Sequence, residues 1–319
     1  MKLRKRRIYF WLAALAAVLL LAAIDLACGS GGLGWMQGPL LWKLRLPRAL
    51  TAFLAGGALA LGGAQMQAVF RNPLADPHIM GVSGGAGLGA ALATLGLTGI
   101  LPQGPWSSLS LSLAAFIGAL AASLLVVRAA VRIRATTTLL LFGVMLGFIF
   151  SAVSALLQYF SNEEGLKLFY SWAAGSFSGS RSGDIGVLAA ALGAGAVLAA
   201  AARKGLDLLL FGEEFAALSG ARVRRVRSLA MLSCCLLTAT VTAFCGPVGF
   251  VGIIAPHMVR RLAGSARHAI VLPGSVLAGG AVALVADILS QCGPVPLPAG
   301  STMALIGIPF ILLLLFKKP

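Results

Sequence analysis

The sequence predicts an all-α integral membrane protein with about ten transmembrane helices per subunit, some of them short or broken, and both termini in the cytoplasm. Composition, apolar segments and the placement of basic residues all indicate this fold. Of the 319 residues, 59% are hydrophobic and 11% are charged, and the mean hydropathy is +0.95. Because roughly a quarter of the residues of a soluble domain are charged, this chain has too little polar surface to cover itself in water.

Ten apolar segments are long enough, or nearly so, to cross a bilayer. A ~30 Å hydrocarbon layer needs about 20 helical residues, and fewer where a helix is short or broken. The third and eighth segments follow or contain stretches rich in glycine and proline, which is typical of bent or broken helices that face protein. The predicted segments are 8–28, 48–70, 82–100, 108–128, 138–160, 184–202, 228–246, 248–260, 271–291 and 299–316.

Basic residues between these segments set the orientation. With the N-terminus in the cytoplasm, 20 of the 25 Lys and Arg fall on the cytoplasmic side. This is the asymmetry that the positive-inside rule predicts, and an even number of spans returns the C-terminus to the same side. The outer side keeps five basic residues: Lys43, Arg45, Arg48, Lys167 and Arg181.

The basic N-terminus followed by an apolar segment could instead be a signal peptide. Its apolar run of roughly 20 residues is longer than the core of a typical signal peptide, and no clean cleavage site follows at 27–29. We therefore expect a retained first span and one membrane domain over residues 1–319, with no soluble domain.

The net charge of +16 does not indicate nucleic acid, because the charges form short clusters between apolar segments rather than a basic stripe. Membrane lipid is the expected partner of these clusters. The five cysteines lack metal-ligand spacing, so buried thiols are expected. A disulfide among Cys28, Cys245 and Cys292 stays open.

Missing motifs exclude most catalytic classes. The sequence has no G-x-x-x-x-G-K-[ST] loop for ATP, only three histidines, and nine scattered acidic residues. We expect no catalytic site and no metal site. An ion-coupled carrier would need ionisable groups inside its spans, and the candidates are Asp25 and Asp287, which we expect to pair with an arginine or a helix end. A secondary transporter remains the alternative.

Four stretches in order carry a resemblance. They are R-L-P-R at 45–48 with G-G-A-L-A-L-G-G-A-Q-M-Q at 56–67, N-P-L-A-D-P with G-V-S-G-G-A-G over 72–87, G-E-E-F-A-A-L-S-G at 212–220, and G-P-V-G-F-V-G opening 246–260. Together they resemble the permease family of the ABC importers for iron-siderophores, haem and cobalamin, over essentially the whole chain.

The resemblance implies a homodimer in the bacterial inner membrane, with the translocation path between its two copies. It also implies two ATP-binding cassette subunits, which use the ATP, and a periplasmic or lipid-anchored substrate-binding protein. No cofactor is expected in the permease itself. The substrate is expected to be an iron chelate (siderophore or haem) or cobalamin, with an iron chelate favoured by family abundance.

The resemblance also implies site residues. Arg45 and Arg48 match a docking site for acidic side chains of the binding protein, which suits the planar guanidinium; interfacial anchoring is the alternative. A third outer arginine of some relatives corresponds to Gln291, so docking could be weaker or could use Lys167 or Arg181.

The polar stretch from 212 to 220 predicts a short helix with acids in its first turn and Gly220 as its terminator. The resemblance makes it a coupling helix that inserts into the ATPase, with Phe215 and Leu218 as apolar contacts. An ordinary surface helix is the alternative, and the arginines that follow could bind anionic lipid. The coupling residues are then Gly212, Glu213, Glu214, Phe215, Ala216, Leu218 and Gly220.

Thr136 and Thr137 match the inner gate of relatives, although threonine hydroxyls also bond to their own helix backbone. Gly84 stands where some cobalamin-type relatives have Asn and is a candidate for the path; close helix packing is the default interpretation of the glycines. His78 and His257 each follow a proline, and a structural histidine is favoured over a haem ligand. The structural residues of the family motifs are Asn72, Pro73, Pro77, Gly81, Gly249, Gly252, Pro256 and His257.

Overall fold

The structure is a computed structural model that describes residues 2–28, 41–96, 107–133, 135–178, 182–291 and 295–316. Within these ranges the chain is helical and contains no strand. Each of the ten predicted segments coincides with one helix. These helices are α1 (Lys2–Ala27), α2 (Leu46–Val69), α3 (Val82–Ala91), α4 (Ser107–Arg132), α5 (Thr136–Tyr159), α7 (Ser182–Leu209), α9 (Val223–Cys245), α10 (Val251–Ala263), α11 (His268–Gln291) and α12 (Ala299–Phe316).

Helix length separates complete spans from shorter ones. Seven helices in the described part of the chain are long and apolar enough to cross a membrane, while Val82–Thr94 and Ala299–Leu314 are shorter apolar helices. Helix α10 has 13 residues, about 20 Å at about 1.5 Å per residue, which is less than the ~30 Å hydrocarbon layer. The expectation that some helices are short is confirmed, and ten spans remain a prediction.

Short elements lie between the long helices. A π-helical turn, η1 (Leu41–Arg45), precedes α2; a 3-10 turn, η2 (Pro77–Met80), precedes α3; and a π-helical turn, η3 (Leu92–Gly96), follows α3. Helix α8 (Glu213–Leu218) was predicted, whereas α6 (Glu163–Ala173) was not. The start of α6 is stabilised by Asn162, whose side-chain oxygen accepts a 2.9 Å hydrogen bond from the Gly165 N–H.

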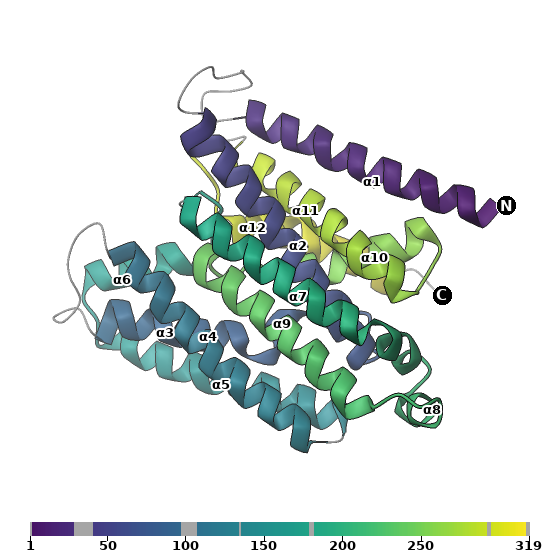
Figure 1. Cartoon of the computed structure of the whole chain (residues 1–319). Helices are drawn as coiled ribbons and strands as arrows, with labels where there is room; N and C mark the ends of the chain where they lie inside the picture. Colours follow the sequence, from purple (N-terminus) through teal and green to yellow (C-terminus); the bar gives the residue numbers. More distant parts are fainter. Residues whose placement is uncertain are drawn as a thin grey trace.

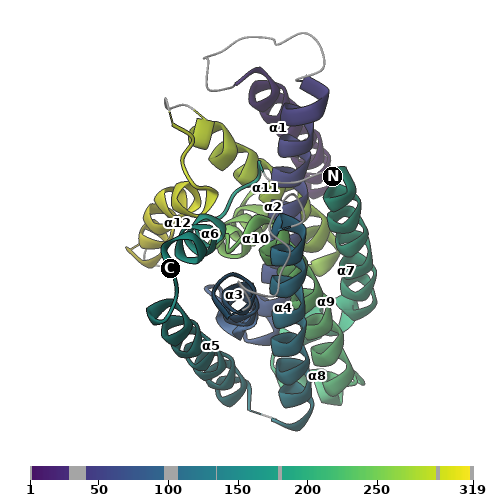
Figure 2. The same cartoon turned by 90° about the vertical axis from the view of Figure 1, so that its left-hand side faces the viewer.

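The long helices run side by side, and the bundle has two distinct ends (Figure 1). Both termini and α8 lie at one end, here named the α8 end, and α6 lies at the other, here named the α6 end. Seen from the α6 end, α3 lies between α4 and α5 (Figure 2). Helix α1 lies along the outside of the bundle (Figure 1).

Helix α2 forms the packed centre of the molecule: 19 of its 24 residues are buried. Its glycines allow this packing. A Cβ on Gly56 would lie 2.3 Å from the carbonyl oxygen of Gly279 in α11, and a Cβ on Gly63 would lie 2.1 Å from that of Gly252 in α10. Any side chain at these two positions would push neighbouring backbones apart, so the prediction of close helix packing is confirmed.

The cysteines in the described ranges are buried, as expected for apolar thiols, and they are Cys28, Cys234, Cys235 and Cys245. Cys245 is a free thiol, so it forms no disulfide with Cys28. Cys292 lies outside the described residues.

Candidate functional site

The second family motif forms a tight connection between α2 and α3. The side-chain oxygen of Asn72 accepts a 2.9 Å hydrogen bond from the Leu74 N–H, which stabilises the turn that contains Pro73. The carboxylate of Asp76 accepts a 2.8 Å bond from the His78 N–H and so begins η2 at Pro77. Gly81 has φ of 75°, a left-handed conformation that favours glycine.

His78 connects this turn to the fourth motif, at 246–260. Its Nε2 lies 2.7 Å from the carbonyl oxygen of Val248, and its Nδ1 is hydrogen-bonded to the Ser83 hydroxyl. Because the carbonyl can only accept, Nε2 carries the proton and Nδ1 accepts from the serine. Both ring nitrogens are therefore occupied, and the interpretation of His78 as a structural histidine is confirmed.

Gln67 completes the same junction by replacing a missing helix bond. Pro256 lies inside α10 and has no N–H, so the carbonyl of Gly252 lacks its usual helical donor. The side-chain amide of Gln67 donates to that carbonyl at 3.0 Å, and its oxygen accepts from the guanidinium of Arg260. A Cβ on Gly252 would lie 2.6 Å from the Pro77 ring. Sequence reasoning missed Gln67, although a glutamine inside an apolar, glycine-rich segment was a signal for it.

Other predicted motif residues have no hydrogen bond in this junction and make different contacts. A Cβ on Gly249 would meet no atom within 4 Å, and His257 places its ring edge-on to Phe310 in α12, with centroids 6.0 Å apart. A Cβ on Gly84 would lie 3.2 Å from Cα of Gly147, so Gly84 here brings α3 against α5. A role for Gly84 in the path stays a prediction.

At the α6 end, Arg48 forms a buried ion pair. Its Nε lies 2.9 Å from both carboxylate oxygens of Asp287, and its Nη2 lies 2.8 Å from one of them and 2.7 Å from the Ser290 hydroxyl. The side chain of Arg48 is 17% exposed and that of Asp287 only 1%. The expectation that Asp287 pairs with an arginine is therefore confirmed.

The network continues to α1 through Gln291. The side-chain amide of Gln291 donates to Asp287 at 3.0 Å and to Asp25 at 3.1 Å. We name Asp25, Arg48, Asp287, Ser290 and Gln291 the Arg48 cluster; it joins α1, α2 and α11. Gln291 is buried within this cluster rather than presented to solvent, where the corresponding arginine of relatives was expected to act.

The remaining docking candidates differ in exposure. Arg45 donates a 2.8 Å bond to the Leu26 carbonyl at the end of α1. Lys167 is exposed on α6, and Arg181 lies outside the described residues. Docking of a binding protein at these positions stays a prediction.

At the opposite end, α8 has an exposed apolar face on a fixed backbone. Gly212 and Gly220 have φ of 114° and 83°. The N–H groups of Gly220 and Ala221 bond to the carbonyls of Ala217 and Ala216, which is the Schellman arrangement that ends a helix. The predicted termination at Gly220 is confirmed.

The side chains of α8 divide into two sets. Ala216 is fully buried, whereas Phe215 is 48% and Leu218 90% exposed. Glu213 lies 3.6 Å from Arg227 at the start of α9, and Arg227 also donates to the carbonyl of Ile133, at 3.3 Å. One arginine therefore connects α8 to the segment before α5.

The gate and coupling candidates share one cavity of about 510 Å³. Thr136 lines it from the first residue of α5, and Arg71 lines it from the end of α2. The other wall is the stretch 211–215 that begins α8. Thr137 is exposed beside it. The structure thus brings together two sets of residues that lie about 76 positions apart in the sequence and that sequence patterns did not connect.

Comparison with known families now decides the class of protein. The model of the FecCD transport family matches residues 8–317. The chain belongs to the FecCD transport family. The vitamin B12 import system permease protein BtuC of Salmonella typhi is 35% identical over 326 residues, which cover 99% of this chain and 97% of the relative. BtuC of Salmonella newport (strain SL254) has the same identity and coverage.

Solved structures give the same fold. An ABC transporter assigned to the metal-chelate type, solved in an inward-facing conformation, has a TM-score of 0.85 and 30% identity and covers 96% of this chain and 98% of its own. PsaBC from Streptococcus pneumoniae in complex with Fab has a TM-score of 0.51 and 18% identity, covers 89% of this chain and 93% of its own, and is similar in fold alone.

Membership of the FecCD transport family confirms the resemblance inferred from the four motifs. The chain is a multi-pass membrane transport subunit. In this member of the family, the first, second and fourth motifs meet in the junction around Gln67 and His78, the R-L-P-R stretch contributes Arg48 to the Arg48 cluster, and the third motif forms α8.

Proposed function

We propose that this chain is the permease of a binding-protein-dependent ABC importer, that two copies form the translocation path, and that they move a bulky metal chelate into the cell by alternating access. The observation that carries the proposal is α8. Leu218 and Phe215 are exposed on a six-residue helix whose two ends are fixed by Gly212 and Gly220. A rigid projection with apolar side chains fits a groove in a partner protein.

The energy source is proposed to be a separate ATPase, two copies of which contact the two α8 helices. The chain has no phosphate-binding loop of its own. Thr136 and the first turn of α8 line the same cavity, and Arg227 contacts both Glu213 and the backbone before Thr136. A displacement of α8 by the ATPase would therefore reach the proposed gate directly.

Packing supports a path between two copies rather than through one. The centre of the subunit is filled by α2, and its glycines bring it into backbone contact with α10 and α11. A bulky chelate cannot pass through a centre packed to that density. The path is therefore expected at the surface of the subunit, where a second copy would complete it.

The distribution of charge supports an orientation with the α8 end in the cytoplasm. Two arginines, Arg71 and Arg227, lie beside α8. Arg6 lies near the N-terminus in α1, and Arg260 lies near the end of α10. The α6 end would then face the binding protein, with Arg45 and Lys167 as its nearest docking residues. This arrangement agrees with the positive-inside rule.

For the substrate, we propose cobalamin as the first candidate and an iron chelate as the second. Relatives that are 35% identical over nearly their whole length import vitamin B12 by name. Some cobalamin-type relatives have Asn at the position of Gly84, and this difference is the reason to test an iron chelate as well. Uptake of radiolabelled cobalamin, a ferric siderophore and haem by cells that carry the full transporter distinguishes the candidates.

The test of the importer role is a double substitution in α8. Phe215→Ser with Leu218→Ser is expected to reduce ATP-driven uptake by at least about tenfold, which corresponds to about 1.4 kcal/mol of lost contact energy. Because both side chains are exposed, thermal unfolding of the permease should not change. Val131→Ser is the matched control, since Val131 is an exposed apolar residue near the same end.

Two outcomes would overturn the proposal. Full uptake by the α8 double variant would show that α8 does not couple to an ATPase. Uptake that continues when the partner ATPase is inactivated, but stops when the proton gradient is collapsed, would instead establish a secondary transporter.

A further inference from the structure

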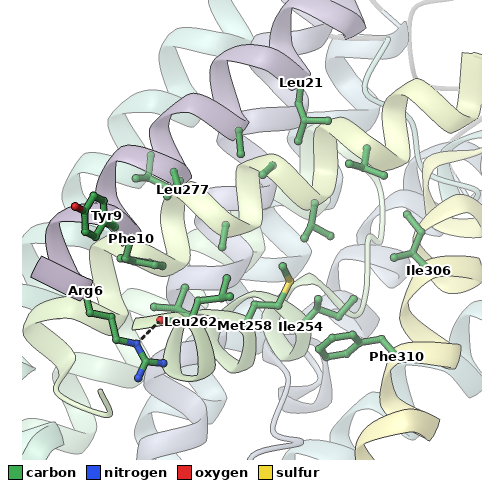
Figure 3. Close-up of a pocket in the computed structure, with 18 residues that line it drawn as sticks. Arg6, Tyr9, Phe10, Leu21, Ile254, Met258, Leu262, Leu277, Ile306 and Phe310 are labelled. Carbon is green, nitrogen blue, oxygen red and sulfur yellow. Dashed lines mark hydrogen bonds between the residues drawn. The ribbon is translucent and has the colours of Figure 1, made fainter. Parts of the chain in front are cut away.

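A long apolar groove lies on the outside of the bundle, between α1, α10, α11 and α12, with a volume of about 1070 Å³ (Figure 3). Small side chains create it: Ala13, Ala14 and Ala17 of α1 face Ala278 and Ala281 of α11. Larger residues at these positions would fill the space. A volume of this size is at the upper end of the range of about 300–1,000 Å³ that ligand pockets occupy.

The groove runs along α1 from Arg6 to Leu21 (Figure 3). Fifteen residues of helix correspond to about 22 Å, at about 1.5 Å per residue. Half of a ~30 Å hydrocarbon layer is about 15 Å. The groove is therefore long enough to hold a lipid acyl chain over the full depth of one leaflet.

Its charge is confined to the α8 end. Arg6 lines the groove there and donates two hydrogen bonds, from Nε and Nη2, to the carbonyls of Leu262 and Arg261 at the end of α10. Its third nitrogen, Nη1, has no hydrogen-bond partner among the described residues. Arg261 lines an adjoining cavity of about 550 Å³, which shares Met258 with the groove. Among the described residues that line these two spaces, none is acidic.

We propose that this groove is a binding site for one anionic phospholipid of the leaflet at the α8 end. An acyl chain lies between the alanines of α1 and α11, and the phosphate contacts Arg6 and Arg261. Charge complementarity carries the choice of occupant: Arg6 lines the groove at its α8 end, Arg261 lines the adjoining cavity, and no acidic side chain is among the described residues that line either space. A guanidinium that already caps a helix can still offer a free N–H pair to a phosphate oxygen. This site is independent of the transported substrate.

Native mass spectrometry of the purified full chain, together with any subunits that accompany it, tests the site. The protein is titrated with phosphatidylglycerol or phosphatidylethanolamine of identical acyl chains, and the number of lipids retained per chain is measured. Phosphatidylglycerol should be retained, one per chain. Arg261→Gln should weaken its retention by about fivefold, the effect of one basic residue at a membrane surface.

Substitution inside the groove separates this site from lipid on the rest of the surface. Ala281→Phe should abolish retention by filling the groove, whereas Ala200→Phe, on the exposed face of α7, should not. Lys204→Gln is the control for charge, because Lys204 is exposed at the end of α7 away from the groove. Arg6 is less suitable for a first test, since it also caps α10.

Three results would overturn the proposal. One is equal retention of phosphatidylethanolamine and phosphatidylglycerol by the unaltered protein. Another is unchanged retention in Ala281→Phe. The third is cross-linking of a cysteine placed at Ala17 to a second copy of the chain, which would show that protein rather than lipid covers the groove.

Discussion

The two ends of the bundle contain their charged residues in different environments. At the α6 end, Arg48 and Asp287 pair inside the protein and share Ser290 and Gln291 with Asp25. At the α8 end, Arg222, Arg224 and Arg225 are exposed, and so are the apolar side chains of α8. The first arrangement binds helices of one chain to each other, whereas the second leaves charge and apolar surface available to partners.

This difference predicts that substitutions at the α6 end affect stability most. Asp287→Ala removes the carboxylate that is hydrogen-bonded to the mostly buried guanidinium of Arg48, and the only other acid of the cluster, Asp25, is bonded to Gln291 instead. Removing one partner of a buried ion pair costs about 3–5 kcal/mol, and the 17% exposure of Arg48 favours the lower value. The thermal unfolding temperature of the detergent-purified protein should therefore fall strongly, which calorimetry or intrinsic fluorescence can measure.

A double variant tests whether the unpaired charge is the cause. Arg48→Met with Asp287→Leu removes both charges and keeps side-chain volume, so it should restore most of the lost stability. If the double variant unfolds as early as Asp287→Ala, the loss arises from packing, and the Arg48 cluster is not an electrostatic link between helices.

An intermediate effect is expected at the α8 end, where Arg227 is the exception because it is buried. Arg227→Gln removes the contact with Glu213 and weakens the bond to the Ile133 carbonyl. Glu213 keeps part of its exposure to water, so the expected loss is about 1.5–2 kcal/mol, in the lower part of the range for hydrogen bonds to charged groups.

Two variants sharpen this prediction. Arg224→Gln changes an exposed charge three residues away and should alter stability by less than about 0.5 kcal/mol. Arg227→Lys keeps the charge but loses the planar fork, so it should lie between the other two. Equal stability of Arg227→Gln and Arg224→Gln, measured by the same unfolding experiment, would contradict a structural role for Arg227.

The helices were predictable because apolar length and terminal residues are local features of the sequence. The acids at 213–214 and Gly220 indicated α8, and glycine and proline indicated the short α10. The start of α9 was predicted near 228, but the helix begins at Val223. The boundary was wrong because the first turns of α9 contain arginines, which do not belong to an apolar segment. Helix α6 was missed because 11 residues with two acids in the first turn do not resemble a span.

The contacts of the site were less predictable because they join distant positions. Arg48 and Asp287 are 239 residues apart, and Gln67 and Gly252 are 185 apart. The type of each side chain can be read from the sequence, but its partner cannot. Arg48 was therefore assigned to docking, a role that requires an exposed guanidinium. In the structure, most of its N–H groups donate to Asp287 and Ser290 of the same chain.

Among the positions with a predicted structural role, the smallest loss of stability is expected for the backbone of α8. Gly220 has φ of 83°, and a Cβ there would meet no atom within 4 Å. Gly220→Ala should therefore lower the free energy of unfolding only by the strain of an alanine in the left-handed conformation, about 1 kcal/mol.

Gly193 in α7 is the matched control, because a Cβ there would also meet no atom within 4 Å, whereas the backbone of Gly193 is helical. Gly193→Ala should stabilise the protein by up to about 1 kcal/mol, so the same added methyl group should shift the unfolding temperature in opposite directions at the two sites. A shift in the same direction would show that the left-handed residue is not what ends α8.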